Sequence, residues 1–484
     1  MTRNLQRKTG QLPSGSPAAA AASISDDATV VVSGFGRAGY PKAVPLALAE
    51  SGRDLALTLI SGGSVGDEID TALVEAGAIA RRFPYQATAS ARAAVNDGTI
   101  AFHDRHISKL GDEVLLGHFG DPDVAIVEAV AVGEDWFIPT TSIGHTLSYV
   151  RSAKKLIVEL NHAQPLSLAA LHDVYERELP PNREPIPIDG PGDRIGAAKI
   201  SFDPGKLDFV VETDRPDKPY QFRAPNDVDR DIAANLAGFL ETEIEVNPLY
   251  ESDVNLQFGV GSLGNALMAS FKSFDFGERT VSYFGEVIQD GLLDMIDEDS
   301  LASASAASLA LSADGQKRLF EDIDRYAKSV IVRNADISNS PTLIDRFGVI
   351  GVNSALEVDI FGNANSTHLG GRHMINGIGG SGDFSRNSTL AVIALSSTAK
   401  DGAISRIVPA VPHVDHTEHD LSVIVTEQGV ADLRGLSPRE RADALIENCA
   451  HPDYRDALRE YLTQATADGG HIPLDTETAF DWTG

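Results

Sequence analysis

Short apolar runs rich in β-branched residues recur along the chain and predict buried strands. They lie at residues 28–33, 55–61, 124–132, 155–160, 254–258, 280–284, 330–332 and 390–395. Runs of this kind are typical of strands that are covered on both faces of a sheet.

Helical spacing of apolar residues is found between these runs. It predicts helices at residues 166–176, 229–241, 287–297, 303–314 and 316–327. Two further helix starts carry local signals. Ser16 precedes Pro17, and Ser437 opens a capping box that ends at Glu440. The alternation of strands with helices predicts the α/β class.

A glycine-rich turn follows the first predicted strand. Residues 34–39 read Gly-Phe-Gly-Arg-Ala-Gly, the G-x-G-x-x-G pattern of dinucleotide-binding folds. Pro41 and Pro45 delay or distort the helix that should follow. The second strand ends in Ser-Gly-Gly at residues 61–63, without the acidic residue that holds a ribose. An NAD-binding oxidoreductase is therefore only a distant alternative.

The G-x-G-x-x-G pattern occurs a second time, as Gly-Val-Gly-Ser-Leu-Gly at residues 259–264. Each copy follows a strand and precedes a helix, another strand and another turn. This recurrence predicts a duplicated α/β unit, and so two similar domains with mostly parallel sheets.

A polar stretch with prolines at residues 212–227 indicates the domain boundary. We therefore expect a flexible N-terminal tail at residues 1–13, a first domain at 14–225 and a second domain at 226–484 that carries Glu286.

Glu286 follows Gly285 at the predicted turn between the strand 280–284 and the helix 287–297. The corresponding turn of the first copy, residues 61–63, has no carboxylate. A carboxylate at a helix start can simply be favoured by the helix dipole. Its place behind a glycine in only one of two copies favours a nucleophile instead.

Four glycines fall within residues 376–382, Asn-Gly-Ile-Gly-Gly-Ser-Gly. Such loops bring the backbone close to a ligand or offer N–H groups to an anion, although a plain tight turn is the alternative. Lys400 lies in a polar turn at residues 396–402 and is a candidate for binding a phosphate. An ordinary solvated lysine would have the same sequence context.

Three histidines and three carboxylates fall within residues 413–420, a composition that would suit zinc. Residues this close together cannot all converge on one ion, and Pro412 favours an extended approach. We expect these side chains to hydrogen-bond one another and the backbone, and we predict no metal site.

The amino-acid composition argues against several classes of binding partner. The chain has 484 residues with 40 basic and 70 acidic side chains, a net charge of −30, which argues against nucleic acid and anionic membrane surfaces. The single cysteine, Cys449, excludes an intrachain disulfide framework. No apolar run approaches the roughly 20 residues that span a bilayer, and no secretory signal is indicated, so we expect a cytoplasmic protein. The acidity hints at a salty cytoplasm.

These segments together resemble the class I coenzyme A transferases, in particular the branch of acetyl-CoA hydrolases and succinyl-CoA:acetate CoA-transferases. The resemblance spans almost the whole chain, and its most specific runs are residues 363–368 and 376–384. It implies two tandem open α/β/α domains, acyl-CoA and small carboxylates as substrates, no tightly bound cofactor, and a homodimer.

The resemblance also implies catalytic roles. Glu286 matches the family's nucleophile, and Asn339 matches the asparagine that orients it. The backbone N–H groups at Leu263 and Gly380 match the oxyanion hole. The expected activity is acyl-CoA:carboxylate CoA transfer of the acetyl/succinyl type through a glutamyl-CoA thioester on Glu286. Acetyl-CoA hydrolysis by the same nucleophile is the alternative, because the sequence does not show whether water is excluded from the site.

Binding roles follow from the same resemblance. The residues expected to bind coenzyme A are Gly259, Gly261, Gly377, Gly379 and Lys400. The cation for the substrate carboxylate is Arg215 or Lys218, where the local sequence departs from the family pattern.

Overall fold

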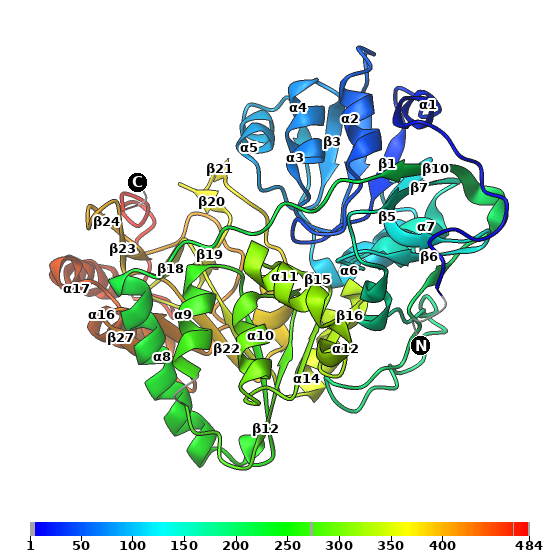
Figure 1. Cartoon of the computed structure of the whole chain (residues 1–484). Coiled ribbons are helices and arrows are strands. Elements are labelled where there is room, and N and C mark those ends of the chain that lie inside the picture. The colour runs from blue at the N-terminus through cyan, green and yellow to red at the C-terminus, as the bar shows by residue number, and fades with distance from the viewer. Residues whose placement is uncertain (1–4, 272–273, 468, 483–484) are drawn as a thin grey trace. The chain divides into compact units, whose positions relative to one another are not determined.

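The computed structural model describes residues 5–271, 274–467 and 469–482 (Figure 1). The chain divides into two compact units. Unit 1 comprises Met1–Gln221, Phe284–Ile296 and Ala302–Ser340, and unit 2 comprises Phe222–Tyr283, Asp297–Leu301 and Pro341–Gly484. The first change of unit, after Gln221, lies close to the expected boundary at residue 225. Glu286 belongs to unit 1, because part of the later chain returns to that unit. The domain limits 14–225 and 226–484 stay a prediction.

Unit 1 is built on a sheet with the strand order β10-β7-β5-β1-β2-β3-β4. The strands are β1 (Thr29–Val32), β2 (Leu57–Ile60), β3 (Ile79–Phe83), β4 (Ala101–Phe102), β5 (Val124–Val132), β7 (Lys155–Asn161) and β10 (Leu207–Thr213). All neighbours along this path run parallel. β6 (Trp136–Pro139) is antiparallel to both β5 and β9 (Ile200–Ser201). Every residue of β5 is buried, as its uninterrupted apolar run predicts.

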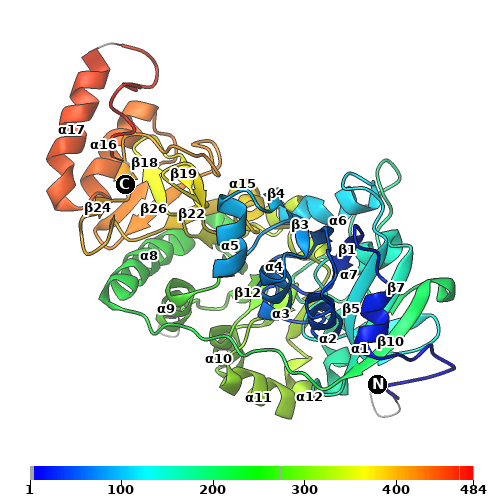
Figure 2. The same ribbon diagram turned by 90° about the horizontal axis from the view of Figure 1, so that it is seen from above.

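Helices cover both faces of this sheet, because alternate strand residues point to opposite sides. They are α1 (Pro17–Ala22), α2 (Ala43–Ala49), α3 (Asp67–Asp70), α4 (Ala72–Glu75), α5 (Ala89–Asn96), α6 (Ile107–Leu115) and α7 (Thr146–Ser152). Helices α1 to α4 lie side by side and share a core with Val30 and Val32 of β1 (Figure 2). Helices α6 and α7 pack on each other, and α7 contacts β1 and β5.

Unit 1 contains further elements, most of them from residues 284–296 and 302–340. β14 (Ser303–Ala306), β16 (Val330–Arg333) and β8 (His172–Asp173) form a parallel row. The remaining elements are β13 (Val287–Ile288), β15 (Ser308–Leu309), α10 (Asp290–Asp297), α11 (Ala313–Glu321), α12 (Ile323–Tyr326), α13 (Ala335–Ser338) and the 3-10 turns Leu166–Ala170 and Pro204–Lys206.

Two predicted helices are wrong. Residues 303–314 begin with the strands β14 and β15, and every residue of these two strands is buried. Most of these residues are serine or alanine, whose small side chains fit between closely packed elements. Residues 166–176 form the turn Leu166–Ala170 and then β8, which pairs with β16. Strand pairing overrides the local apolar spacing in both segments.

The helix predicted at residues 287–297 begins only at Asp290. Val287 and Ile288 pair instead with Ser308 and Leu309, as β13 and β15. Glu286 therefore lies in a bend between two strands rather than at a helix start. A favourable helix dipole is thus not the reason for its position.

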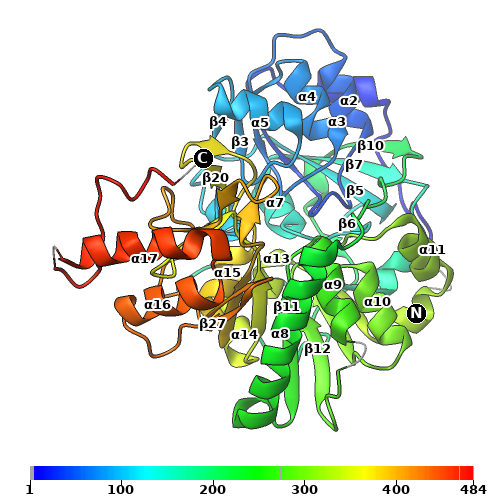
Figure 3. The ribbon, with the colours of Figure 1, turned by 90° about the vertical axis from the view of Figure 1, so that its left-hand side faces the viewer.

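Unit 2 contains strands in the order β27-β26-β22-β17-β11-β12, of which Figure 3 labels β27, β11 and β12. They are β11 (Asp253–Phe258), β12 (Thr280–Phe284), β17 (Ile350–Asn353), β22 (Leu390–Ala394), β26 (Val423–Thr426) and β27 (Gly429–Asp432). Only β27 is antiparallel to its neighbour in this row of described strands. The predicted α/β class with mostly parallel sheets is confirmed.

Helices and short strand pairs complete unit 2. The helices are α8 (Asp227–Val246), α9 (Ser262–Phe271), α14 (Pro341–Arg346), α15 (Ser381–Asn387), α16 (Pro438–Asn448), α17 (Pro452–Ala467) and the 3-10 turn Pro248–Tyr250. The short strands are β18 (Glu357–Asp359), β19 (Ala364–Asn365), β20 (His368–Leu369), β21 (His373–Met374), β23 (Thr398–Ala399), β24 (Ile404–Ser405) and β25 (Ile407–Val408). Helix α15 packs on β17 and β22, and α8 packs on α9 and β26.

The described part of the expected N-terminal tail, residues 5–13, is bound to unit 1. The Arg7 guanidinium donates to the backbone oxygens of Val130 (3.2 Å), Asn161 (3.2 Å) and Gln164 (2.8 Å). Three hydrogen bonds to carbonyls at the end of the sheet hold this segment in place. Within the described ranges, no helix is both long enough and apolar enough to cross a membrane.

Candidate active site

β1 leads into a tight turn with Gly36 and Arg37 at its tip. The Phe35 N–H donates to the Ala38 oxygen (3.0 Å), and the Ala38 N–H donates back to the Phe35 oxygen (3.2 Å). The φ angles of Gly36 and Arg37 are 57° and 63°. Two positive φ angles at the tip are the signature of a type I′ turn.

A carboxylate of the protein already binds the N-terminus of the helix that follows this turn. Helix α2 begins only at Ala43, and the buried Glu159 carboxylate occupies its N-terminus. It accepts hydrogen bonds from the backbone N–H groups of Lys42 (2.8 Å), Ala43 (2.9 Å) and Val44 (2.6 Å). These are the donors that a pyrophosphate would need, so the NAD alternative is wrong.

The Glu286 backbone is held tightly while its side chain is half-buried. Its oxygen accepts hydrogen bonds from Ala307 N–H (2.9 Å) and Ser308 N–H (3.2 Å), and Gly285 N–H donates to the Ser305 oxygen (3.0 Å). The bend is therefore fixed on both sides of the carboxylate.

Asn339 contacts the Glu286 carboxylate directly. Its Nδ2 donates to Glu286 Oε1 at 3.1 Å, and Ser338 Oγ donates to Asn339 Oδ1 at 3.1 Å. Asn339 is fully buried at the C-terminal end of α13. An amide in this position orients the carboxylate and favours its charged form. The catalytic roles of both residues stay predictions.

The glycine turn of unit 1 packs next to this bend. A methyl group added at Gly36 would lie 3.2 Å from Ser308 Oγ and 3.4 Å from a methyl group of Val287. Phe35 and Val287 belong to one buried apolar cluster, against which Tyr220 packs. The turn at residues 34–39 is thus a neighbour of the Glu286 segment.

Two tyrosines near Glu286 were missed by sequence reasoning. Burial raises the pKa of the Tyr85 phenol, and Tyr220 and Glu286 raise that pKa further, whereas Arg37 lowers it. Burial likewise raises the pKa of Tyr220. Both phenols therefore stay protonated, and the Tyr85 phenol does so within electrostatic range of the Glu286 carboxylate. No local motif marks either residue, because only the fold brings them to Glu286.

A buried ionic network lies beneath the turn. Lys42 Nζ lies 2.6 Å from Glu128 Oε1 and 2.8 Å from Asp217 Oδ1. Burial by itself lowers the pKa of Lys42, but its carboxylate partners, Asp217 and Glu128, raise it above its ordinary value. Asp217 also accepts hydrogen bonds from Gly39 N–H (3.1 Å) and the Thr141 hydroxyl. This network fixes the segment that carries Lys218.

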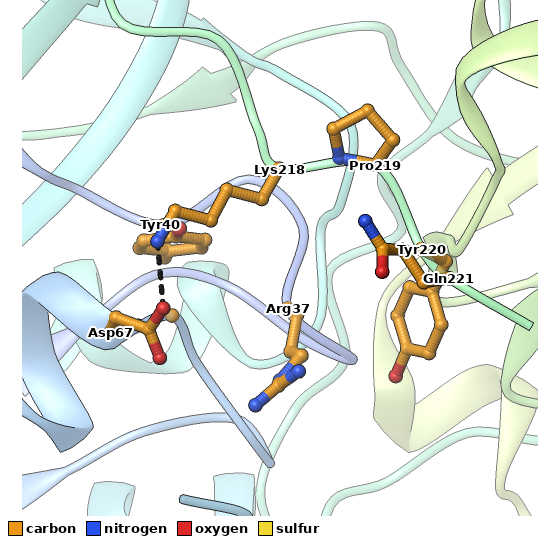
Figure 4. Close-up of a pocket in the computed structure, with 8 residues that line it drawn as sticks. Arg37, Tyr40, Asp67, Lys218, Pro219, Tyr220 and Gln221 are labelled. Atoms are coloured by element: carbon orange, nitrogen blue, oxygen red, sulfur yellow. Dashed lines mark hydrogen bonds and ion pairs between the residues drawn. The ribbon is translucent and has the colours of Figure 1, made fainter.

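Lys218 lines a cavity of about 370 Å³ in unit 1, together with Arg37, Tyr220 and Asp67 (Figure 4). Its Nζ forms an ion pair with Asp67 Oδ2 at 2.7 Å. Arg215 is exposed and is not among the residues that line this cavity. Of the two predicted carboxylate-binding cations, Lys218 therefore lines this cavity and Arg215 does not.

The second glycine turn lines a cavity of about 180 Å³ in unit 2. Gly259, Gly261 and Leu263 line this cavity, which lies where β11 ends and α9 begins. Gly261 has a φ of 147°, which favours glycine. Leu263 lies in the first turn of α9, where the helix itself offers no acceptor for a backbone N–H.

Gly380 is the N-cap residue of α15, and Gly379 before it has a φ of 57°. Gly377 and Gly379 belong to the loop that leads into this helix. Helix α15, which this loop precedes, packs on β17, and β17 pairs with β11, which the turn at 259–261 follows.

Lys400 is exposed at the turn between β23 and β24, with a φ of 50°. It lines a cavity of about 410 Å³ in unit 2 together with Arg223, Arg406 and Leu263. This cavity brings together two residues that the sequence predicted to act, Lys400 and Leu263. The lining also contains the carboxylates of Asp229, Asp401 and Glu427, and Arg223 is paired with Asp229 at 2.7 Å.

The histidine-rich segment forms hydrogen bonds, as predicted. Asp415 contacts His413 Nε2 (3.2 Å) and accepts from the backbone N–H of Ser366 (2.6 Å). His416 Nε2 lies 3.1 Å from Ser366 Oγ and 3.2 Å from Ser381 Oγ. Within the described ranges, no group of three or more His, Cys, Asp or Glu residues is placed to hold a metal ion.

Comparisons with known proteins agree with this geometry. Residues 7–213 match the acetyl-CoA hydrolase/transferase N-terminal domain, and residues 315–462 match the C-terminal domain of the same family. The chain belongs to the acetyl-CoA hydrolase/transferase family. The resemblance drawn from the sequence motifs is thereby confirmed.

Members of this family align along almost the whole chain. The chain is 44% identical over 469 residues to a succinyl-CoA:acetate CoA-transferase of Clostridium kluyveri, covering 96% of this chain and 87% of the relative. It is 38% identical over 452 residues to an acetyl-CoA hydrolase of Yarrowia lipolytica, covering 90% and 86%. RipA from Yersinia pestis has a similar fold, with a TM-score of 0.72 at 23% identity over 93% of this chain and 97% of that chain.

Proposed function

We propose that the chain is an acyl-CoA:carboxylate CoA-transferase of the acetyl/succinyl type that works through a covalent glutamyl-CoA thioester on Glu286. The observation that carries the proposal is the setting of this carboxylate. It is half-buried, its backbone is fixed at a bend, and Asn339 Nδ2 lies 3.1 Å from Oε1. Coenzyme A takes part as a substrate rather than as a resident cofactor.

The first half-reaction loads the enzyme. A Glu286 oxygen attacks the thioester carbonyl of the acyl-CoA, the C–S bond breaks, and coenzyme A leaves as a thiolate. The product on the enzyme is a mixed anhydride. The thiolate then attacks the glutamyl carbonyl, the donor carboxylate leaves, and a glutamyl-CoA thioester remains.

The second half-reaction runs the same steps in reverse with the acceptor. The acceptor carboxylate attacks the glutamyl thioester and expels the thiolate, and a new anhydride forms. The thiolate attacks the acceptor carbonyl, which releases the new acyl-CoA and restores the Glu286 carboxylate. Each tetrahedral intermediate is an oxyanion, for which the family resemblance assigns the N–H groups of Leu263 and Gly380. Loss of one such donor typically costs about 100- to 1,000-fold in rate.

Acetyl-CoA hydrolase activity is the second candidate function. Named hydrolases align along most of the chain, and water can take the place of the acceptor carboxylate on either activated intermediate. Initial rates with acetyl-CoA plus succinate, compared with acetyl-CoA alone, separate the two activities. We expect succinate to raise the rate of acetyl-CoA consumption and to yield succinyl-CoA.

Trapping of the intermediate tests the covalent step. After incubation with acyl-CoA, borohydride or hydroxylamine should modify Glu286, and mass spectrometry of peptides should find the change at that residue. E286Q should lose transfer activity by about 1,000-fold or more and should not be trapped. E298Q, at an exposed glutamate, is the matched control and should behave like the wild type. Near-normal turnover by a folded E286Q enzyme would contradict the proposal.

The cytoplasmic location and the homodimer remain predictions drawn from the sequence. So do coenzyme A binding by Lys400 and the four glycines of unit 2, and carboxylate binding by Arg215 or Lys218.

A further inference from the structure

Arg37 occupies a backbone conformation that favours glycine. It is the second tip residue of the turn at 34–39, with a φ of 63°. Its N–H donates to the Ser64 oxygen at 3.0 Å, and the Phe35–Ala38 hydrogen bonds close the turn around it. An arginine in the left-handed region costs conformational energy, which a glycine at this position would avoid.

The Arg37 guanidinium is an available positive charge. Its side chain is exposed, and no hydrogen bond or ion pair joins it to another residue in the described part of the chain. Lys218, the other cation of the 370 Å³ cavity, is already paired with Asp67 at 2.7 Å. The Arg37 side chain extends between that ion pair and Tyr220 (Figure 4). Among the described residues that line this cavity, Arg37 is therefore the cation that an entering anion can pair with directly.

The cavity lies close to the nucleophile. Gly36, the neighbour of Arg37, packs against Val287, the neighbour of Glu286, since a methyl group added at Gly36 would lie only 3.4 Å from the Val287 side chain. Both charges act on the Tyr85 phenol. Burial has the largest effect and raises the pKa of Tyr85, Glu286 raises this pKa further, and Arg37 lowers it. Both the Arg37 guanidinium and the Glu286 carboxylate therefore lie within electrostatic range of the Tyr85 phenol, and the residues that precede and follow them in the chain are in contact.

We propose that Arg37 binds the second, non-reacting carboxylate of a dicarboxylic substrate whose other carboxyl group reacts at Glu286. The inference rests on the proposed function and names a specificity residue for it. A guanidinium binds a carboxylate through two parallel charge-assisted hydrogen bonds, which gives both affinity and orientation. A monocarboxylate such as propionate lacks the group that Arg37 recognises. Lys218 lines the same cavity and stays paired with Asp67.

Steady-state kinetics of the full chain test this assignment. With acetyl-CoA as the donor, the wild type and R37Q are compared with succinate and with propionate as acceptors. R37Q should raise the KM for succinate by about 10- to 100-fold, since one charge-assisted pair is lost. The KM values for propionate and acetyl-CoA should stay within about twofold. R37K should recover part of the succinate affinity, because it restores the charge without the bidentate geometry.

R37G separates binding from folding. Glycine adopts a φ of 63° freely, so R37G should unfold at a higher temperature than the wild type while it loses succinate affinity as R37Q does. R81Q, at an exposed arginine of β3 outside this cavity, is the matched control and should leave both KM values unchanged.

Three outcomes would overturn the inference: an equal rise in KM for both acceptors, a rise in KM for acetyl-CoA, or no change at all. A wild-type enzyme that transfers to no acceptor would instead overturn the proposed function.

Discussion

Glu286 depends on a side chain that lies 53 positions further along the chain. Ser338 Oγ donates to Asn339 Oδ1, and Asn339 Nδ2 donates to Glu286 Oε1, so that three residues form one chain of hydrogen bonds. Ser338 and Asn339 are fully buried. In a buried setting such a chain is strong and keeps one orientation, because water does not compete for its members.

We expect N339A to lower kcat by about 10- to 100-fold, because the carboxylate loses a donor that orients it. The KM for acyl-CoA should change little, since Asn339 contacts the nucleophile. S338A should give a smaller loss in the same direction, as it removes only the support of Asn339. Steady-state kinetics with a thermal melt of each variant measure both effects. Wild-type kcat in a folded N339A enzyme would show that Asn339 has no positioning role.

Two histidines of unit 1, His145 and His172, are buried. His145 lies directly before α7 with Nε2 2.9 Å from the Ile107 oxygen, and His172 lies on β8 with Nε2 2.8 Å from the Thr140 oxygen. A carbonyl can only accept, so Nε2 carries the proton in each ring. Burial lowers the pKa of each histidine from 6.5 to about 4.

These histidines make the protein sensitive to acid. Between pH 6.5 and 4 the unfolded chain binds protons that the native histidines do not, so native stability falls as the pH falls through this range. Each histidine contributes up to about 3 kcal/mol above pH 6.5, which is lost towards pH 4. H145Q and H172Q should each make the melting temperature less dependent on pH in this range. H419Q, at a histidine with 83% of its side chain exposed, should keep the wild-type slope. An unchanged slope in both buried variants would contradict the assignment.

Local sequence signals predicted some elements better than others. The capping box at Ser437 and Glu440 opens α16 as predicted, because both partners lie within one helical turn. The helix predicted at residues 303–314 was wrong, because β14 and β15 form through contacts with distant strands. A helix cap can be predicted from residues close together in the sequence, whereas the formation of a strand depends also on the distant strand with which it pairs.

At the scale of the whole molecule, 70 acidic residues oppose 40 basic ones. Exposed ion pairs such as Lys154–Asp123 cannot neutralise a net charge of −30, so repulsion among the acidic side chains outweighs surface pairing. Salt screens this repulsion, since the Debye length falls from about 10 Å at 0.1 M to about 3 Å at 1 M.

We therefore expect the melting temperature to rise between 0.1 M and 1 M KCl, by about 1 °C for each kcal/mol of repulsion that is screened. Differential scanning fluorimetry at fixed pH measures the shift. Sucrose at matched osmolality is the control, because it acts by exclusion from the surface without screening charge. A melting temperature that falls with KCl would mean that surface ion pairs dominate.

The α/β class, the family, the candidate carboxylate at residue 286 and the glycine-rich turns could all be recognised from short stretches of the chain. These are properties of short segments, and short segments carry their own conformational and chemical preferences. The folded chain was needed to show that Glu286 belongs to the first compact unit, that Asn339 Nδ2 lies 3.1 Å from its carboxylate, and that Arg37 lines a cavity with Lys218. These relations depend on side-chain direction and on contacts between distant residues, because the pairing of strands and the packing of helices establish both.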